Sequence, residues 1–154
     1  ILVIIPRHPE HATIIQDKCS EAGLKCVILS ELVKISSSPD VFISNHIGAP
    51  AIWLPITDFA LIGGTYCDIN GHNPWEPVNF GVAVLHGPKT ANFSEDFKEL
   101  IASNSSTEIL ETDELAKVIT HKNFDSQIKN AKSLIQRKIR AVQDLSNDIL
   151  LLLN

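Results

Sequence analysis

The chain has 154 residues and is 44% hydrophobic, which suits one globular domain with a full core. Its net charge of −5 disfavours nucleic acid as a partner, because neutralising phosphates requires clustered Lys and Arg. It contains no apolar stretch long enough to span a bilayer, so we expect neither a membrane span nor a signal peptide in these residues. It also lacks methionine and begins inside an apolar run, residues 1–5, so we expect a piece of a longer protein cut at or near a domain boundary.

Short apolar runs alternate with segments of helical spacing along the chain. The runs expected as strands, the last of them weaker than the others, are residues 1–5, 26–29, 41–44, 59–62, 82–85 and 107–110. The expected helices are 10–22, which stops at Gly23, a poorer one at 48–57 that contains Pro55, and 94–102, 112–120 and 124–154. This alternation predicts an α/β fold with a doubly wound, Rossmann-like parallel sheet, whose ligands bind beyond the carboxyl ends of the strands.

Two groups of residues are interpreted structurally rather than functionally. The three cysteines, Cys19, Cys26 and Cys67, lack metal-ligand spacing and are expected to be reduced, the first two packed as small hydrophobes in a helix and a strand. The late basic residues are expected to form a solvated helix face, with a surface for anionic lipid as the alternative: Lys129, Lys132, Arg137, Lys138 and Arg140.

The most informative stretch is residues 71–77, Gly-His-Asn-Pro-Trp-Glu-Pro. It follows an apolar strand that ends in Gly63-Gly64, and it leads into a helix with Glu76 in its first turn. Glycines let the backbone approach a ligand closely, a helix N-terminus offers unpaired N–H groups, and a carboxylate accepts hydrogen bonds. The two prolines fix backbone angles, so this loop is suited to presenting its carboxylate rigidly to a polar ligand.

Residues 71–77 resemble the signature loop of the 3-deoxy-D-manno-octulosonic acid (Kdo) transferases, which build the inner core of lipopolysaccharide. Three further stretches resemble the same family in the same order: residues 4–10 (Ile-Ile-Pro-Arg-His-Pro-Glu), 58–64 (Asp-Phe-Ala-Leu-Ile-Gly-Gly) and 86–93 (His-Gly-Pro-Lys-Thr-Ala-Asn-Phe). The resemblance covers residues 1–145 and implies the carboxyl-terminal, donor-binding domain, one half of a two-domain GT-B glycosyltransferase. Residues 146–154 are expected to end the last helix and to pack on the amino-terminal domain, which this chain lacks.

The resemblance implies transfer of Kdo from CMP-Kdo to the lipid A precursor, at the cytoplasmic face of the inner membrane of a Gram-negative bacterium. The family's catalytic base lies in the amino-terminal domain, so this chain is expected to be inactive by itself and to be soluble. Membrane association is expected only through the full-length protein. No cofactor and no metal are implied, because none of the six histidines shows the short paired spacing of a metal site.

The resemblance also implies which residues contact the donor. Arg7 is expected to bind the CMP phosphate and so to stabilise the leaving group, and Glu76 is expected to accept hydrogen bonds from the ribose hydroxyls. The residues expected to bind the CMP part are Pro6, Arg7, Ile47, Gly48, Ala49, Asn73, Pro74, Trp75 and Glu76. The further candidates for donor contacts are Gly64, Gly71, His72 and Thr90. Ala49 departs from the family, which usually has glutamate after this glycine.

Structural alternatives exist for several of these residues. Arg7 is alternatively a surface arginine, Glu76 a residue favoured by the helix macrodipole, and His72 a loop residue packed on Trp75. Thr90 or Asn92 is expected to cap the helix at 94–102 in preference to touching the donor. At the level of function, the alternatives are a GT-B transferase for another nucleotide sugar and a nucleotide-binding module without catalysis.

Overall fold

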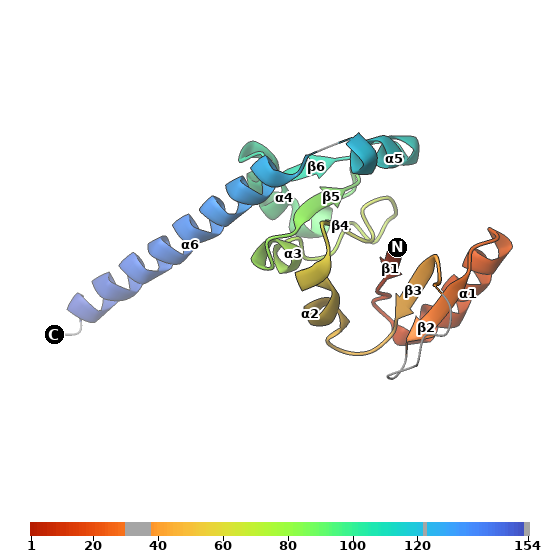
Figure 1. Ribbon diagram of the computed structural model, residues 1–154. Coiled ribbons are helices and arrows are strands. Elements are labelled where there is room, and N and C mark those ends of the chain that lie inside the picture. Colours follow the sequence, from red (N-terminus) through yellow and green to blue (C-terminus); the bar gives the residue numbers. More distant parts are fainter. Residues whose placement is uncertain (30–37, 122, 153–154) are drawn as a thin grey trace. The chain divides into compact units, whose positions relative to one another are not determined.

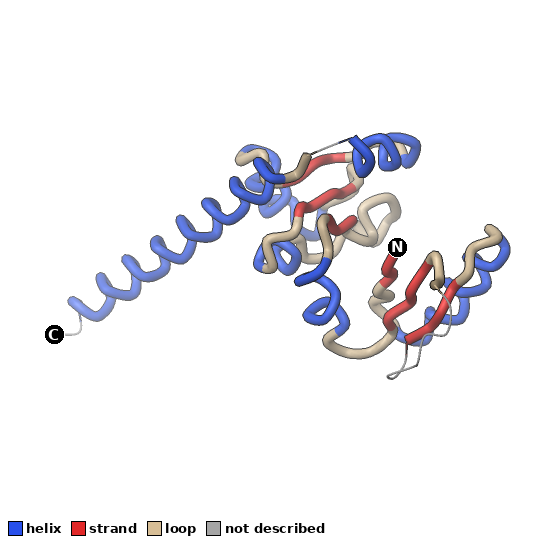
Figure 2. The backbone as a smooth tube through the Cα atoms, viewed as in Figure 1, coloured by secondary structure: helices blue, strands red, loops and turns tan. Residues whose placement is uncertain are grey.

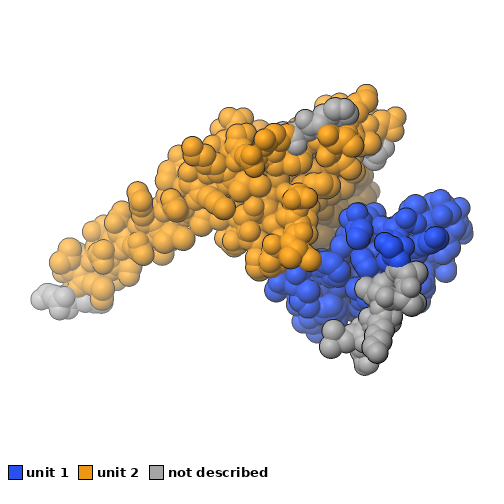
Figure 3. Space-filling view, viewed as in Figure 1, with its two compact units in different colours: residues 1–53 blue, residues 54–154 orange. Residues whose placement is uncertain are grey.

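The computed structural model describes residues 1–29, 38–121 and 123–152. The chain divides into two compact units, residues 1–53 and residues 54–154 (Figure 3). Each unit contains a three-stranded parallel sheet (Figure 2). The predicted α/β fold with parallel strands is therefore confirmed, and the six strands in the described residues are shared equally between two sheets.

Unit 1 has strand order β1-β3-β2. Its elements are β1 (Leu2–Ile4), a 3-10 turn (Pro9–His11), α1 (Ala12–Glu21), β2 (Cys26–Leu29), β3 (Val41–Ser44) and α2 (Ala49–Trp53) (Figure 1). Helix α1 ends where Gly23 takes a φ of +76°, which confirms the predicted stop. The central strand β3 is buried along its whole length because it has a strand on each side and α1 against it.

The core of unit 1 joins α1 to the sheet. Cys19 of α1 is buried beside Val41 and Ile43 of β3, and Cys26 of β2 packs against this cluster. Both cysteines are free thiols, and burial raises the pKa of the Cys26 thiol. The prediction that they pack as small hydrophobes in a helix and a strand is confirmed.

Unit 2 has strand order β4-β5-β6. Its elements are a 3-10 turn (Leu54–Ile56), β4 (Phe59–Leu61), α3 (Trp75–Asn79), β5 (Ala83–His86), a 3-10 turn (Ala91–Phe93), α4 (Ser94–Ala102), β6 (Ser106–Glu108), α5 (Thr112–His121) and α6 (Asp125–Leu152) (Figure 1). The poorly helical segment 48–57 thus resolves into α2 and a 3-10 turn, and Pro55 lies in the turn, after α2 has ended.

The central strand β5 is covered on both faces, as its continuous apolar sequence predicts. Val84 packs into one cluster with Phe97 and Leu100 of α4, and with Ala131 and Leu134 of α6. Its neighbours along the strand, Ala83 and Leu85, pack into a second cluster with Ile109 and Phe124. Successive side chains of a strand point to opposite faces, so one short strand supports two cores.

Helix α6 is buried only in its first part. Its buried side chains are Gln127, Ala131 and Leu134, and every described residue from 136 onward is exposed. Figure 1 shows this helix extending past the rest of unit 2. None of the described helices is both long enough and apolar enough to cross a membrane. Packing of residues 146–154 on another domain stays a prediction, and its last two positions, 153 and 154, lie outside the described residues.

Candidate nucleotide-binding site

The loops that follow β4 and β5 are joined through one buried side chain, Thr65. Its hydroxyl donates a hydrogen bond to the carbonyl of Ile62 at 2.8 Å and accepts one from the backbone N–H of Gly87 at 2.8 Å. The carbonyl of Thr65 accepts a third bond from the backbone N–H of Lys89 at 2.9 Å. Sequence reasoning missed Thr65, although its position directly after Gly63-Gly64 is a signal for a turn with a hydroxyl that bonds backbone.

Two glycines close the loop that precedes the signature stretch. The backbone N–H of Gly71 donates to the carbonyl of Gly64 at 3.0 Å, and these residues have φ values of +87° and +76°. A Cβ on Gly64 would lie 2.8 Å from a methyl carbon of Ile69. Glycine is required at both positions because a side chain would strain the left-handed backbone, and at Gly64 it would also clash.

Asn92 holds this loop from the β5 side. Its side-chain amide donates to the carbonyl of Ile69 at 2.6 Å, and its backbone N–H donates to the carbonyl of Asn70 at 3.1 Å. The prediction that Thr90 or Asn92 caps the following helix is therefore wrong, because the Asn92 side chain is used in this contact between loops. The N-cap residue of α4 is Phe93, and Thr90 precedes the 3-10 turn without a capping bond from its side chain.

The signature stretch presents an acidic side chain to solvent. Asn73 accepts a hydrogen bond from the backbone N–H of Trp75 at 3.0 Å, an Asx turn that leads into α3, and Pro74 between them is buried. Glu76 follows in the first turn of α3, exposed and without an ion pair or hydrogen bond to its carboxylate within the described part of the chain. His72 is half-buried, with its ring beside Gly63. Glu76 is therefore accessible to a ligand.

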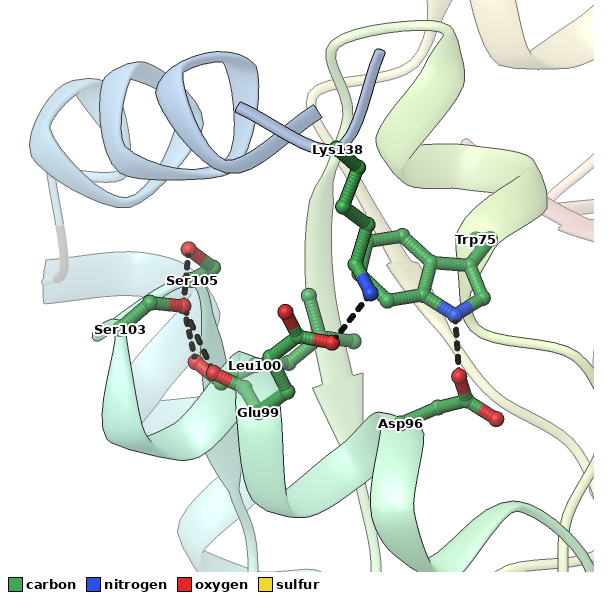
Figure 4. A network of polar contacts seen from close by, with 7 residues as sticks. All are labelled: Trp75, Asp96, Glu99, Leu100, Ser103, Ser105 and Lys138. Atoms are coloured by element: carbon green, nitrogen blue, oxygen red, sulfur yellow. Dashed lines mark hydrogen bonds and ion pairs between the residues drawn. The ribbon is translucent and has the colours of Figure 1, made fainter. Parts of the chain in front are cut away.

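The Trp75 side chain contacts other residues of unit 2 (Figure 4). Its indole N–H donates to the carboxylate of Asp96 in α4 at 2.7 Å, and the ammonium of Lys138 in α6 lies 4.8 Å from the ring centre. Lys138 also pairs with Glu99 of α4. Lys138 is exposed, as expected of a solvated basic face, and it also contacts two neighbouring helices.

The candidate residues of unit 1 follow its strands in the same way. Arg7 comes after β1, exposed and without an ion-pair partner among the residues that the structure describes, and Pro6 before it is half-buried. After β3, Ile47 is 99% exposed and Gly48 has a φ of +86°. Ala49 is fully buried at the start of α2, so none of its atoms is accessible to a ligand in this structure. Within each unit, the candidate residues thus lie beyond the carboxyl ends of strands.

The histidine of the fourth motif, His86, has a structural position at the end of β5. It is fully buried, with Nδ1 2.8 Å from the carbonyl of Gly87 and its ring centre 4.6 Å from that of Phe97. Burial lowers the pKa of its imidazole, so the folded protein favours the neutral ring.

We expect this histidine to make unit 2 less stable in acid. In the unfolded chain His86 takes up a proton near its ordinary pKa of 6.5, whereas the folded chain resists protonation until lower pH. The stabilisation is therefore present above pH 6.5 and is lost below it, by at most about 1.4 kcal/mol per pH unit. His86→Asn, whose amide can still donate to Gly87, should show a smaller change in unfolding free energy than the native chain between about pH 7 and pH 5. Equal slopes in His86→Asn and in the native chain would contradict this, and exposed His8→Asn is the control.

No cluster of three or more His, Cys, Asp or Glu side chains suited to a metal ion occurs in residues 1–29, 38–121 and 123–152.

Comparison with known proteins identifies relatives for this arrangement. No protein-family model matches the chain. A 3-deoxy-D-manno-octulosonic acid transferase of Aquifex aeolicus is 33% identical over 100 residues, which cover 65% of this chain and 27% of that protein. The transferase of the same name from Haemophilus influenzae is 29% identical over 112 residues, or 73% of this chain and 26% of that protein. The chain thus spans about a quarter of the length of these curated relatives.

The fold also has a match among solved structures. The C-terminal CMP-Kdo binding domain of WaaA from Acinetobacter baumannii superimposes with a TM-score of 0.79 at 21% identity, over 87% of this chain and 72% of that one. The fold is therefore that of the carboxyl-terminal domain of a GT-B glycosyltransferase. Several of the proteins similar to this chain are Kdo transferases, and the resemblance predicted from four ordered motifs is confirmed.

Proposed function

We propose that this chain is the donor-binding part of a glycosyltransferase that transfers Kdo from CMP-Kdo to the lipid A precursor. The observation that carries the proposal is the signature loop after β4. It presents the accessible carboxylate of Glu76 from a frame built by Gly64, Gly71 and Thr65. The sequence similarity to Kdo transferases and the shared fold support CMP-Kdo as the ligand.

The proposed reaction displaces CMP from the anomeric carbon of Kdo. The acceptor hydroxyl needs a general base, and the departing phosphate needs a positive charge. The resemblance assigns the base to the amino-terminal domain of the longer protein, which also would carry the acceptor and the contact with the inner membrane. In this chain, the guanidinium of Arg7 is proposed to bind the phosphate, and Glu76 is proposed to bind the ribose. No metal or cofactor takes part in this scheme.

Nucleotide fragments test the two assignments. A hydrogen bond to a charged group is worth about 1.5–3 kcal/mol, or roughly ten- to a hundredfold in affinity. Arg7→Ala should lower the affinity for CMP by that factor and change the affinity for cytidine little, because cytidine lacks the phosphate. Glu76→Ala should lower the affinities for CMP and cytidine alike and change the affinity for 2′,3′-dideoxycytidine little. Calorimetric titration measures all three ligands, with exposed Arg140→Ala and Asp113→Ala as controls for loss of charge.

The same titrations can overturn the proposal. If Arg7→Ala weakens CMP and cytidine equally, the phosphate role is wrong. If neither substitution changes any affinity, the site lies elsewhere. Tighter binding of UDP than of CMP would instead favour a transferase for another nucleotide sugar. The remaining alternative is a nucleotide-binding module without catalysis. To test it, the chain is joined to the amino-terminal half of a Kdo transferase and Kdo transfer is assayed; binding of CMP without transfer would favour that alternative.

A further inference from the structure

Helix α3, which carries Glu76, is joined to the rest of unit 2 by a set of polar contacts that the signature sequence does not include. Trp75 directly precedes Glu76, and its indole N–H donates to Asp96 of α4 at 2.7 Å. The ammonium of Lys138, on α6, lies over the same indole ring and pairs with Glu99 of α4 (Figure 4). One aromatic side chain thereby connects three helices.

The geometry of this cluster fixes the indole in several ways. The Asp96 contact is a charge-assisted hydrogen bond, which is directional and stronger than a neutral one. The Lys138 contact is a cation–π interaction that prefers the ring face, so it constrains the plane of the ring. Trp75 also packs against the buried cluster formed by Ile62, Val78, Val84, Phe97, Leu100, Ala131 and Leu134. The indole is therefore held at its edge by α4 and on one face by α6.

The backbone around Glu76 is anchored by buried residues on both sides, Pro74 before it and Pro77 and Val78 after it. Helix α3 has five residues, too few to be stable by itself, and its side-chain contacts must therefore set its direction. Glu76 itself has no partner within the described residues. The polar contacts of the adjacent Trp75 join this packing in setting the direction of α3, and with it the direction in which the Glu76 carboxylate points.

We propose that Asp96 and Lys138 are positioning residues for the donor site, which act by locking Trp75 and thereby aiming the Glu76 carboxylate at the ribose of the nucleotide. This inference rests on the proposed function for its ligand and goes beyond it, because Asp96 and Lys138 lie outside all four motifs that resemble Kdo transferases. It also gives Trp75 a role through its internal contacts, with no stacking of its indole on the nucleotide.

The first experiment tests the lock without any ligand. In a Trp53→Phe background, Trp75 is the single tryptophan, so the NMR signal of its indole N–H is unambiguous. Exchange of this proton with solvent should be at least about tenfold faster in Asp96→Ala than in the parent, because the bond to the carboxylate is absent. Glu95→Ala, a neighbouring acid on the same helix, should leave the rate unchanged. Equal rates in the parent and in Asp96→Ala would overturn the proposal.

The second experiment tests the effect on the nucleotide. Asp96→Ala and Lys138→Met should each lower the affinity for CMP by roughly three- to tenfold. The affinity for 2′,3′-dideoxycytidine 5′-monophosphate should not change, because Glu76 is proposed to bind only the ribose hydroxyls that this analogue lacks. The losses should vanish in a Glu76→Ala background, although neither residue is seen to touch Glu76. Lys138→Arg should restore CMP affinity, and Lys98→Met is the control for loss of a lysine from the surface.

The two experiments separate the possible failures. If the substitutions lower the affinities for CMP and for 2′,3′-dideoxycytidine 5′-monophosphate equally, the cluster only stabilises the fold and the positioning role is overturned. The same follows if the losses of affinity persist in the Glu76→Ala background. If the parent protein binds no CMP while the indole exchange responds as expected, the proposed function fails, and the aim at a ribose fails with it. If CMP binds and the exchange does not respond, the proposed function stands and the lock is wrong.

Discussion

Replacing Phe97 by alanine is expected to lower the unfolding free energy of unit 2 by about 3–5 kcal/mol, because the substitution opens a large cavity in a packed core. Phe97 is 1% exposed, it lies in the cluster between β5, α4 and α6, and its ring contacts that of buried His86. It also lies beneath the signature loop, since a Cβ built on Gly71 would be 3.6 Å from its ring. The loop should therefore lose order together with the core.

The measurement is chemical denaturation followed by fluorescence of Trp75 in a Trp53→Phe background, so that only unit 2 is observed. Ile101→Ala is the matched control, because Ile101 lies on the same helix and is 45% exposed. It should lower the unfolding free energy by about 1 kcal/mol or less. Comparable losses for the two variants would show that the α4 face carrying Phe97 does not form the core.

Replacing Gly87 by alanine is expected to lower the unfolding free energy by about 3 kcal/mol, at the upper end of the usual cost of overpacking. A Cβ at this position would lie 2.5 Å from the carbonyl oxygen of Thr65 and 2.9 Å from the ring of Tyr66. The carbonyl cannot withdraw easily, because it accepts a hydrogen bond from Lys89, and the Tyr66 hydroxyl bonds to the carbonyl of Ile109. The added methyl must therefore separate the loops after β4 and β5.

Gly63→Ala is the control for this substitution, since it adds the same methyl to the facing loop, which follows β4. Its Cβ would meet only the His72 ring, at 3.5 Å, which is an ordinary contact. The unfolding free energy of Gly63→Ala should change by about 0.5 kcal/mol or less. Both variants are compared by denaturation and by CMP titration, and we expect only Gly87→Ala to lose affinity. A Gly87→Ala protein as stable as Gly63→Ala would mean that the two loops are not held together at Thr65.

Features that depend on neighbouring residues could be predicted from the sequence, whereas contacts between residues far apart in the chain could not. The ends of β2, β3 and α4 were predictable because they depend on local apolar periodicity. The capping role of Asn92 was predicted wrongly, because its amide bonds a loop 23 residues away, and local sequence carries no trace of that contact. Lys138 likewise reads as a surface residue of a long helix, and its contacts with Trp75 and Glu99 arise only when α6 packs on α3 and α4.

The sequence by itself determined the α/β class, the parallel strands and the four motifs that identify the Kdo transferases as relatives, because these depend on residue order and spacing. Only the tertiary structure decided that Thr65 joins two loops, that the Trp75 indole is held inside unit 2, and that Glu76 remains accessible beside it. The physical reason is that a hydrogen bond needs its two groups within about 3 Å, and which distant groups meet at that distance is set by the packing of the folded chain.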